Sequence, residues 1–121
     1  MPMNEPSVVR FDTQAIARLR KFGSDTLLFE MIDLTIAGAR SRLDAARQAI
    51  ADGDLETARA GFHSLKSTSA QMGAMAMGDL CERGEQLSGI GDVGALTALL
   101  PELDSEYQAM HAWLTDIRAG G

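Results

Sequence analysis

The chain has little of several residue types that would point to particular kinds of protein. Its single cysteine, Cys81, excludes an internal disulfide and any multi-thiolate zinc site within one chain. No stretch approaches the roughly 20 consecutive apolar residues that cross a bilayer. The N-terminal MPMNEPSVVR lacks the basic and apolar regions of a signal peptide. We therefore expect a cytoplasmic protein without membrane insertion.

Basic residues are also in the minority, with 11 Lys and Arg against 17 Asp and Glu and a formal net charge of -6. This balance works against nucleic acid as a partner, because binding to phosphates needs a basic surface. A length of 121 residues with 45% hydrophobic residues fits one globular domain that folds around one core. We expect a monomer with a flexible arm over residues 1–10 and a helical domain over residues 11–119.

The composition and spacing of the apolar residues predict an all-α fold. Two of the three prolines precede residue 7, and the interior is rich in Ala, Leu, Met, Arg, Glu and Gln, which favour helices. The spacing predicts helices over about 13–22, 25–52, 55–72, 75–87 and 93–118. Phe22 and Leu34 count among the apolar positions of the first two helices, and Pro101 suggests a kink or a restart in the last. Short glycine-containing turns, including residues 88–94, favour an up-and-down antiparallel four-helix bundle with a short additional N-terminal helix.

The third helix carries the most informative pattern. Its apolar and small residues recur at spacings of three and four, which is typical of a bundle seam: Leu55, Ala58, Phe62, Leu65, Ser69 and Met72. At about 100° per residue, His63 lies roughly 120° from the centre of this seam, so we expect its ring to be exposed. Its neighbours one turn away are Arg59, Ala60, Lys66 and Ser67, and none is a large apolar residue.

An exposed histidine with a lysine one turn later suits phosphoryl chemistry. A neutral imidazole has a nitrogen lone pair that can attack phosphorus near pH 7. The ammonium group of Lys66, at i+3, can stabilise the negative phosphoryl group, and a nearby hydroxyl can add a contact. The same spacing also arises by chance on a solvated helix, so the spacing alone leaves both interpretations open.

Residues 63–74, HSLKSTSAQMGA, resemble the His-x-Leu-Lys-Gly-Ser-x-x-x-x-Gly-Ala signature of histidine-containing phosphotransfer (HPt) domains. LCERGEQL at 80–87 resembles the segment that follows this signature in the family. FDTQAIARLRKFGSDTLLFEMIDLTI, DGDLETA and LDSEYQAMHAWL resemble other helical segments of the family. The resemblance covers all but the first eight or so residues.

The resemblance implies a phosphocarrier without catalytic turnover of its own. His63 would accept a phosphoryl group from an aspartate of a receiver domain or hybrid sensor histidine kinase, and pass it to another receiver. Lys66 would support the phosphoryl group, Leu65 would be a buried anchor and Gly73 would end the helix. Ser67 stands where the family usually has glycine, and its hydroxyl is a candidate phosphoryl contact. No cofactor or metal is implied, and any Mg²⁺ would belong to the partner receiver.

The partner should dock on the second helix and on the outer face of the third helix around His63. The residues expected in this docking surface, besides His63, Lys66 and Ser67, are Arg59, Ala60, Ser64 and Ala70. Two alternatives stay open. One is a docking module that binds or sequesters receivers without being phosphorylated. The other is the phosphoacceptor domain of a chemotaxis-type kinase, which would need a separate ATP-binding domain.

Other motifs favour structural interpretations. Gly89, Gly91 and Gly94 fit G-x-G-x-x-G, but they follow a predicted helix, whereas a dinucleotide-binding loop follows a strand. His63, His111 and Cys81 lack the spacing of a metal site or a Cys-His nucleophile. Glu82 and Glu85 are expected to be solvated on an outward helical face.

Overall fold

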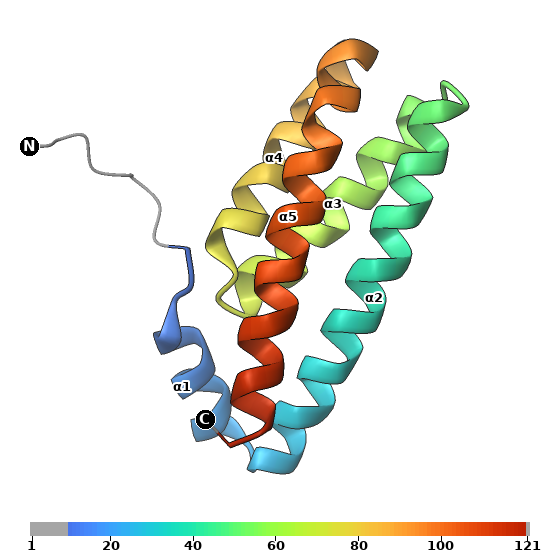
Figure 1. The fold of residues 1–121 in the computed structure, drawn as a ribbon. Helices are drawn as coiled ribbons and strands as arrows, with labels where there is room; N and C mark the ends of the chain where they lie inside the picture. Colours follow the sequence, from blue (N-terminus) through green and yellow to red (C-terminus); the bar gives the residue numbers. More distant parts are fainter. Residues whose placement is uncertain (1–9, 121) are drawn as a thin grey trace, which may run out of the picture.

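The computed structural model describes residues 10–120, which form five helices (Figure 1). They are α1 (Thr13–Phe22), α2 (Asp25–Ala51), α3 (Leu55–Gln71), α4 (Met75–Ile90) and α5 (Val93–Arg118). The described residues contain no named strand, and one isolated bridge pairs Phe11 with Ala74. The prediction of an all-helical fold is therefore confirmed. Residues 1–9 of the expected arm lie outside the described residues.

The helix boundaries follow from local capping. The side chains of Asp54 and Asp92 accept hydrogen bonds from the main-chain amides of Thr57, at 3.2 Å, and Ala95, at 3.0 Å. Gly73, which follows the last turn of α3, has a φ of 86°, a left-handed conformation that favours glycine. The fourth helix ends at Ile90 instead of Leu87, because the left-handed residue that caps it is Gly91, with a φ of 78°.

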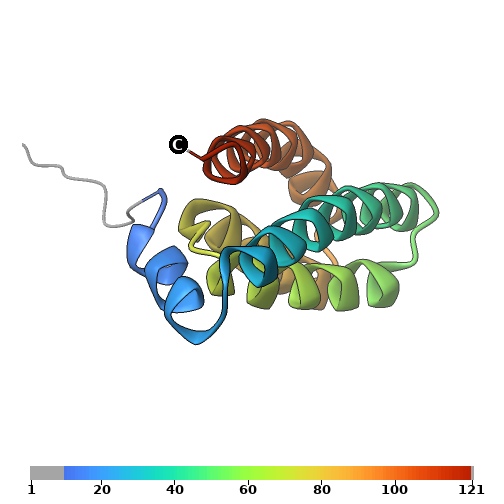
Figure 2. The same ribbon diagram turned by 90° about the horizontal axis from the view of Figure 1, so that it is seen from below.

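The four longer helices lie alongside one another, and α1 lies beside one end of them (Figures 1 and 2). α3 packs against α2 and α4, while α5 packs against α2 and α4. Apolar side chains from all five helices form one core between them. Its largest fully buried members are Phe62, Leu28, Ile32, Leu43, Leu65, Met72, Met77, Leu96, Leu103, Met110 and Leu114.

The contact between α3 and α4 depends on small residues on α4. Gly78, Cys81, Gly84 and Ser88 are its buried positions together with Met77, while Leu80 and Leu87 are only partly buried beside them. A Cβ atom at Gly84 would lie 2.9 Å from atoms of the Phe62 ring, which is fully buried. The absence of a side chain at Gly84 therefore lets α4 approach the seam of α3 closely.

Two predicted core positions are wrong, and one of the two alternatives at Pro101 is excluded. Phe22 and Leu34 are 87% and 73% exposed, so neither belongs to the core. Both residues lie on helices that bury another face in the core. The apolar stripe of each helix is broader than the surface that the neighbouring helices cover, so its outer members stay exposed. α5 continues through Pro101, which is exposed, and does not restart there.

The segment before α1 packs against the turn between α3 and α4. The Asp12 amide donates to the Gly73 carbonyl at 2.7 Å, and the Met75 amide donates to the Arg10 carbonyl at 3.0 Å. The Arg10 carbonyl thus caps the start of α4, where no side chain does so. The Phe11 ring stacks on Trp113 of α5, with 4.5 Å between ring centroids. These contacts hold the turn that ends α3.

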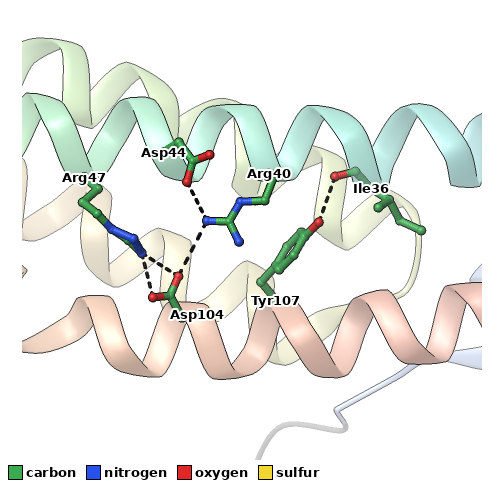
Figure 3. Close-up of polar contacts among 6 residues, drawn as sticks. All are labelled: Ile36, Arg40, Asp44, Arg47, Asp104 and Tyr107. Carbon is green, nitrogen blue, oxygen red and sulfur yellow. Dashed lines mark hydrogen bonds and ion pairs between the residues drawn. The ribbon is translucent and has the colours of Figure 1, made fainter.

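Polar contacts also join α2 to α5 (Figure 3). Arg47 lies 2.6 Å from Asp104, and the Tyr107 hydroxyl donates to the Ile36 carbonyl at 3.3 Å. The Arg40 guanidinium lies over the Tyr107 ring, 4.9 Å from its centroid. Because partly exposed ion pairs contribute little, the buried ring of Tyr107 stabilises this contact more than the charges do.

We predict that Gly84→Ala destabilises the protein while Gly89→Ala does not. A methyl group at Gly84 must displace the buried Phe62 ring, at an expected cost of about 1–3 kcal/mol. A Cβ at Gly89, also in α4, meets nothing within 4 Å, and the loss of glycine should add up to about 1 kcal/mol of stability. Chemical denaturation measures both, and equal effects would contradict the packing described.

Candidate functional site

The buried seam of α3 turns His63 toward solvent. Ala58, Phe62, Leu65 and Ser69 are all buried, whereas the His63 side chain is 64% exposed. The predicted orientation of the helix is therefore confirmed, including the burial of Leu65. The histidine stands on a rigid helix whose own position is set by the core.

Glu85 of α4 joins the two functional candidates of α3. Its Oε2 lies 2.8 Å from His63 Nδ1, and its Oε1 lies 2.9 Å from Lys66 Nζ. The side chain of Glu85 is only 19% exposed, so the expectation that Glu85 is solvated is wrong. Glu85 follows Gly84 directly, and the close approach of α4 at that glycine brings the carboxylate against the flank of α3.

The two contacts of Glu85 differ in quality. Oε2 lies at hydrogen-bond distance from the imidazole, while Oε1 is buried without a well-aligned hydrogen bond from any described residue. The contact with Lys66 is therefore an ion pair of short distance and poor alignment. The Lys66 ammonium has three N–H donors, so donors remain for a further anion beside this contact.

The charges of the site fix the chemistry of the ring. Lys66, and secondly His63, lower the pKa of the Glu85 carboxyl, while Glu85 raises the pKa of Lys66. Both groups are therefore charged near neutral pH. An ionised carboxylate only accepts hydrogen bonds, so Nδ1 must carry the proton that it shares with Glu85. In the neutral ring the lone pair then lies on Nε2.

The other predicted site residues surround His63 on α3. Arg59, Ala60, Ser67 and Ala70 are exposed, and Ser64 is half-buried with its carbonyl accepting from the Thr68 hydroxyl. A polar hollow of about 320 Å³ lies beside the site, between α3 and α4. It is lined by Arg59, Lys66, Glu82, Glu85, Gln86 and Gly89.

Other candidate residues lie elsewhere. His111 is exposed on α5, and Cys81 is fully buried, which raises the pKa of its thiol to about 12. A thiol of this kind stays protonated and is not an activated nucleophile. No group of three or more potential metal ligands occurs among the described residues. Gly89 lies in α4, Gly91 in the turn and Gly94 in α5, so the G-x-G-x-x-G pattern spans two helices.

The sequence singled out His63 and Lys66 as candidates but did not place Glu85 beside them. The signal was present in the pair Glu82 and Glu85, one turn apart on the helix that follows the histidine. The helical period places Glu82 and Glu85 at the edge of the exposed face of α4. Which of the two contacts His63 depends on the rotation of α4 and on its distance from α3.

The fold and the site together define a helical protein that presents an exposed histidine beside a lysine and a carboxylate. The family model described as the Hpt domain matches residues 30–119, and the chain belongs to this family. Membership supports a role in histidine phosphotransfer within a phosphorelay, in which HPt domains interact with receiver domains and kinases.

A solved structure is similar over nearly the whole chain. It is histidine-containing phosphotransfer protein B (HptB) from Pseudomonas aeruginosa PAO1, with a TM-score of 0.87 and 23% sequence identity. The match covers 95% of this chain and 99% of the other, and it supports the fold. No curated protein matches the chain. None of the described helices is both long and apolar enough to span a membrane.

We predict that Lys66→Ala and Phe62→Ala affect stability very differently. Lys66 lies off the seam in a partly exposed ion pair, so its loss should change the free energy of unfolding by less than about 1 kcal/mol. Phe62 is fully buried, and its truncation should cost about 3–5 kcal/mol. Urea unfolding followed by circular dichroism measures both; an unfolded Lys66→Ala or an unaffected Phe62→Ala would mean that α3 is rotated.

Proposed function

We propose that the protein is a phosphorelay carrier that accepts a phosphoryl group on His63 from a receiver-domain aspartate and passes it to another receiver. The phosphorylated donor receiver is either a free-standing response regulator or part of a hybrid sensor histidine kinase. The observation that carries the proposal is the exposed His63 ring, whose Nδ1 is held 2.8 Å from Glu85. That contact leaves Nε2 as the nitrogen available to a partner.

The transfer itself needs no proton to move. The Nε2 lone pair attacks phosphorus, the bond between phosphorus and the aspartate oxygen breaks, and the aspartate leaves as a carboxylate. The proton on Nδ1 stays on the ring, where it faces Glu85. The reverse sequence passes the phosphoryl group to the next aspartate. The protein acts as a stoichiometric carrier, and positioning supplies its contribution to the rate.

Lys66 and Ser67 are the proposed contacts of the phosphoryl group. Lys66 Nζ lies one helical turn beyond His63, and its poor alignment with Glu85 Oε1 allows it to turn toward a new anion. The exposed Ser67 hydroxyl can donate a further hydrogen bond.

The proposed scaffold is an up-and-down antiparallel four-helix bundle of α2 to α5, with α1 as the short additional helix, in a domain over residues 11–119. Two- and three-residue connections between α2, α3, α4 and α5 support this arrangement, because so short a connection returns the chain along its neighbour.

The proposed docking surface comprises Arg59, Ala60, Ser64 and Ala70 of α3 with the adjoining face of α2. Gly61 of α3 lies opposite the main chain of Arg42 of α2. Leu34 precedes Arg42 by about two turns of α2, so in an antiparallel pair it lies beside the part of α3 about two turns after Gly61. That is the level of Ser67 and Ala70. The Leu34 side chain is 73% exposed, and at this level of α3 it can contact a partner that docks around His63.

His63→Gln should abolish labelling by a phosphorylated receiver domain, because no other described side chain combines an exposed imidazole with a neighbouring lysine and carboxylate. Lys66→Ala should stay labelled but more slowly. Acid-labile phosphate on gels, measured with a panel of phosphorylated receivers, gives both results. Equal labelling of wild type and His63→Gln would contradict the proposal, and binding without any labelling would favour the docking module instead.

Leu34→Lys should weaken receiver binding by about tenfold, since a well-placed apolar contact contributes more than about 1 kcal/mol. Ile90→Lys is the matched control, because Ile90 is 76% exposed at the turn between α4 and α5. Calorimetric titration with the receiver found by labelling measures both affinities. Similar losses for the two variants would remove Leu34 from the docking surface.

A further inference from the structure

Glu85 contacts both candidate residues of the site, His63 and Lys66, which a purely structural ion pair would not require. It lies between the phosphate-accepting ring and the lysine proposed to hold the phosphoryl group, and it contacts both within 3 Å. One of its oxygens is buried without an aligned hydrogen bond. A buried, partly satisfied carboxylate is costly, and its position beside a proposed dianion adds repulsion.

The charged groups around His63 come from two helices. Arg59 and Lys66 of α3 and Glu82 and Glu85 of α4 line the same hollow. Of these, only Glu85 lies within 4 Å of the His63 ring nitrogens in an ion pair. Within residues 10–120, no ion pair joins α2 or α5 to His63, Lys66 or Glu85. Glu85 is therefore the group whose charge acts most directly on the ring.

From this geometry we infer that Glu85 is a positioning residue that makes the phosphohistidine short-lived and biases the relay toward donation to the next receiver. The inference rests on the proposed function. It assigns to Glu85 the control of how long the phosphoryl group stays on His63.

The reason lies in the protonation of the phosphorylated ring. With phosphorus on Nε2, a proton on Nδ1 makes the ring a cation, and breaking the N–P bond then returns a neutral imidazole. Without that proton, the ring would have to leave as an imidazolate, which is a far poorer leaving group. The carboxylate of Glu85 at Nδ1 favours the cationic ring. The electron pair of the N–P bond returns to Nε2, and the phosphoryl group goes to an aspartate or to water.

Glu85 also competes with the phosphoryl group for Lys66. In the resting protein the ammonium is 2.9 Å from Glu85 Oε1, and this carboxylate draws the positive charge toward α4 and away from a phosphoryl group on Nε2. Both effects speed the loss of the phosphoryl group, since the first keeps the ring protonated as a better leaving group and the second draws a cation away from the phosphoryl oxygens.

The test compares wild type with Glu85→Gln, which keeps the size and a hydrogen-bond acceptor but removes the charge. Both proteins are phosphorylated with phosphoramidate, which labels imidazole without a receiver, and hydrolysis is followed by ³¹P NMR between about pH 5 and pH 9. Glu85→Gln removes one negative charge at hydrogen-bond distance from the ring, so the half-life of the phosphohistidine at about pH 8 should lengthen by about tenfold. The midpoint of the pH profile should move to lower pH by about 1 unit.

Glu82→Gln is the matched control, because it removes the same charge from the same helix without touching the ring. Glu82 instead accepts a hydrogen bond from Gln86 at 3.4 Å and acts on Lys66 only as a weaker charge, so its variant should change the half-life much less than Glu85→Gln does. An unchanged half-life and pH midpoint in Glu85→Gln would overturn the inference, while transfer from a phosphorylated receiver to wild-type His63, measured alongside, upholds the proposed function. Equal shifts in the two variants would also overturn the inference. Failure of every phosphorylated receiver to label wild-type His63 would overturn the proposed function and the inference with it.

Discussion

The close packing of α4 on the seam of α3 is the constraint on which the site depends. Phe62 fills the space left by the missing side chain of Gly84, and the next residue, Glu85, is thereby brought to the flank of α3. One helical turn of α3 then presents His63 and Lys66 to the two carboxylate oxygens. A larger residue at Gly84 would separate the helices and move the carboxylate before it affected the histidine itself.

The same packing explains how a small surface site can be well defined. His63 is mostly exposed, so it makes few contacts that would orient its ring. The hydrogen bond from Nδ1 to a carboxylate that is itself held by the helix contact supplies that orientation. The contacts of Arg10 and Asp12 with the end of α3 and the start of α4 act in the same direction, since they fix the turn between the two helices.

Much of this architecture could be predicted from the sequence because it follows from local rules. Aspartates at helix starts and glycines after helix ends gave the boundaries, and the spacing of Ala58, Phe62 and Leu65 gave the rotation that exposes His63. The errors occur where contacts between residues distant in the sequence determine which side chains are buried. Phe22 and Leu34 extend apolar stripes beyond the contact that buries them, and Glu85 differs from Glu82 only through the rotation of α4 against α3. No local pattern contains that rotation.

We infer that Glu85 holds the Nδ1 proton of His63 and leaves Nε2 as the reactive nitrogen. Long-range ¹H–¹⁵N NMR of the histidine ring tests this assignment on the resting protein and after phosphorylation with phosphoramidate. We expect a proton on Nδ1 and an unprotonated Nε2 in the neutral ring, followed by ³¹P coupling to Nε2. A neutral ring protonated on Nε2, or phosphate attached to Nδ1, would contradict it.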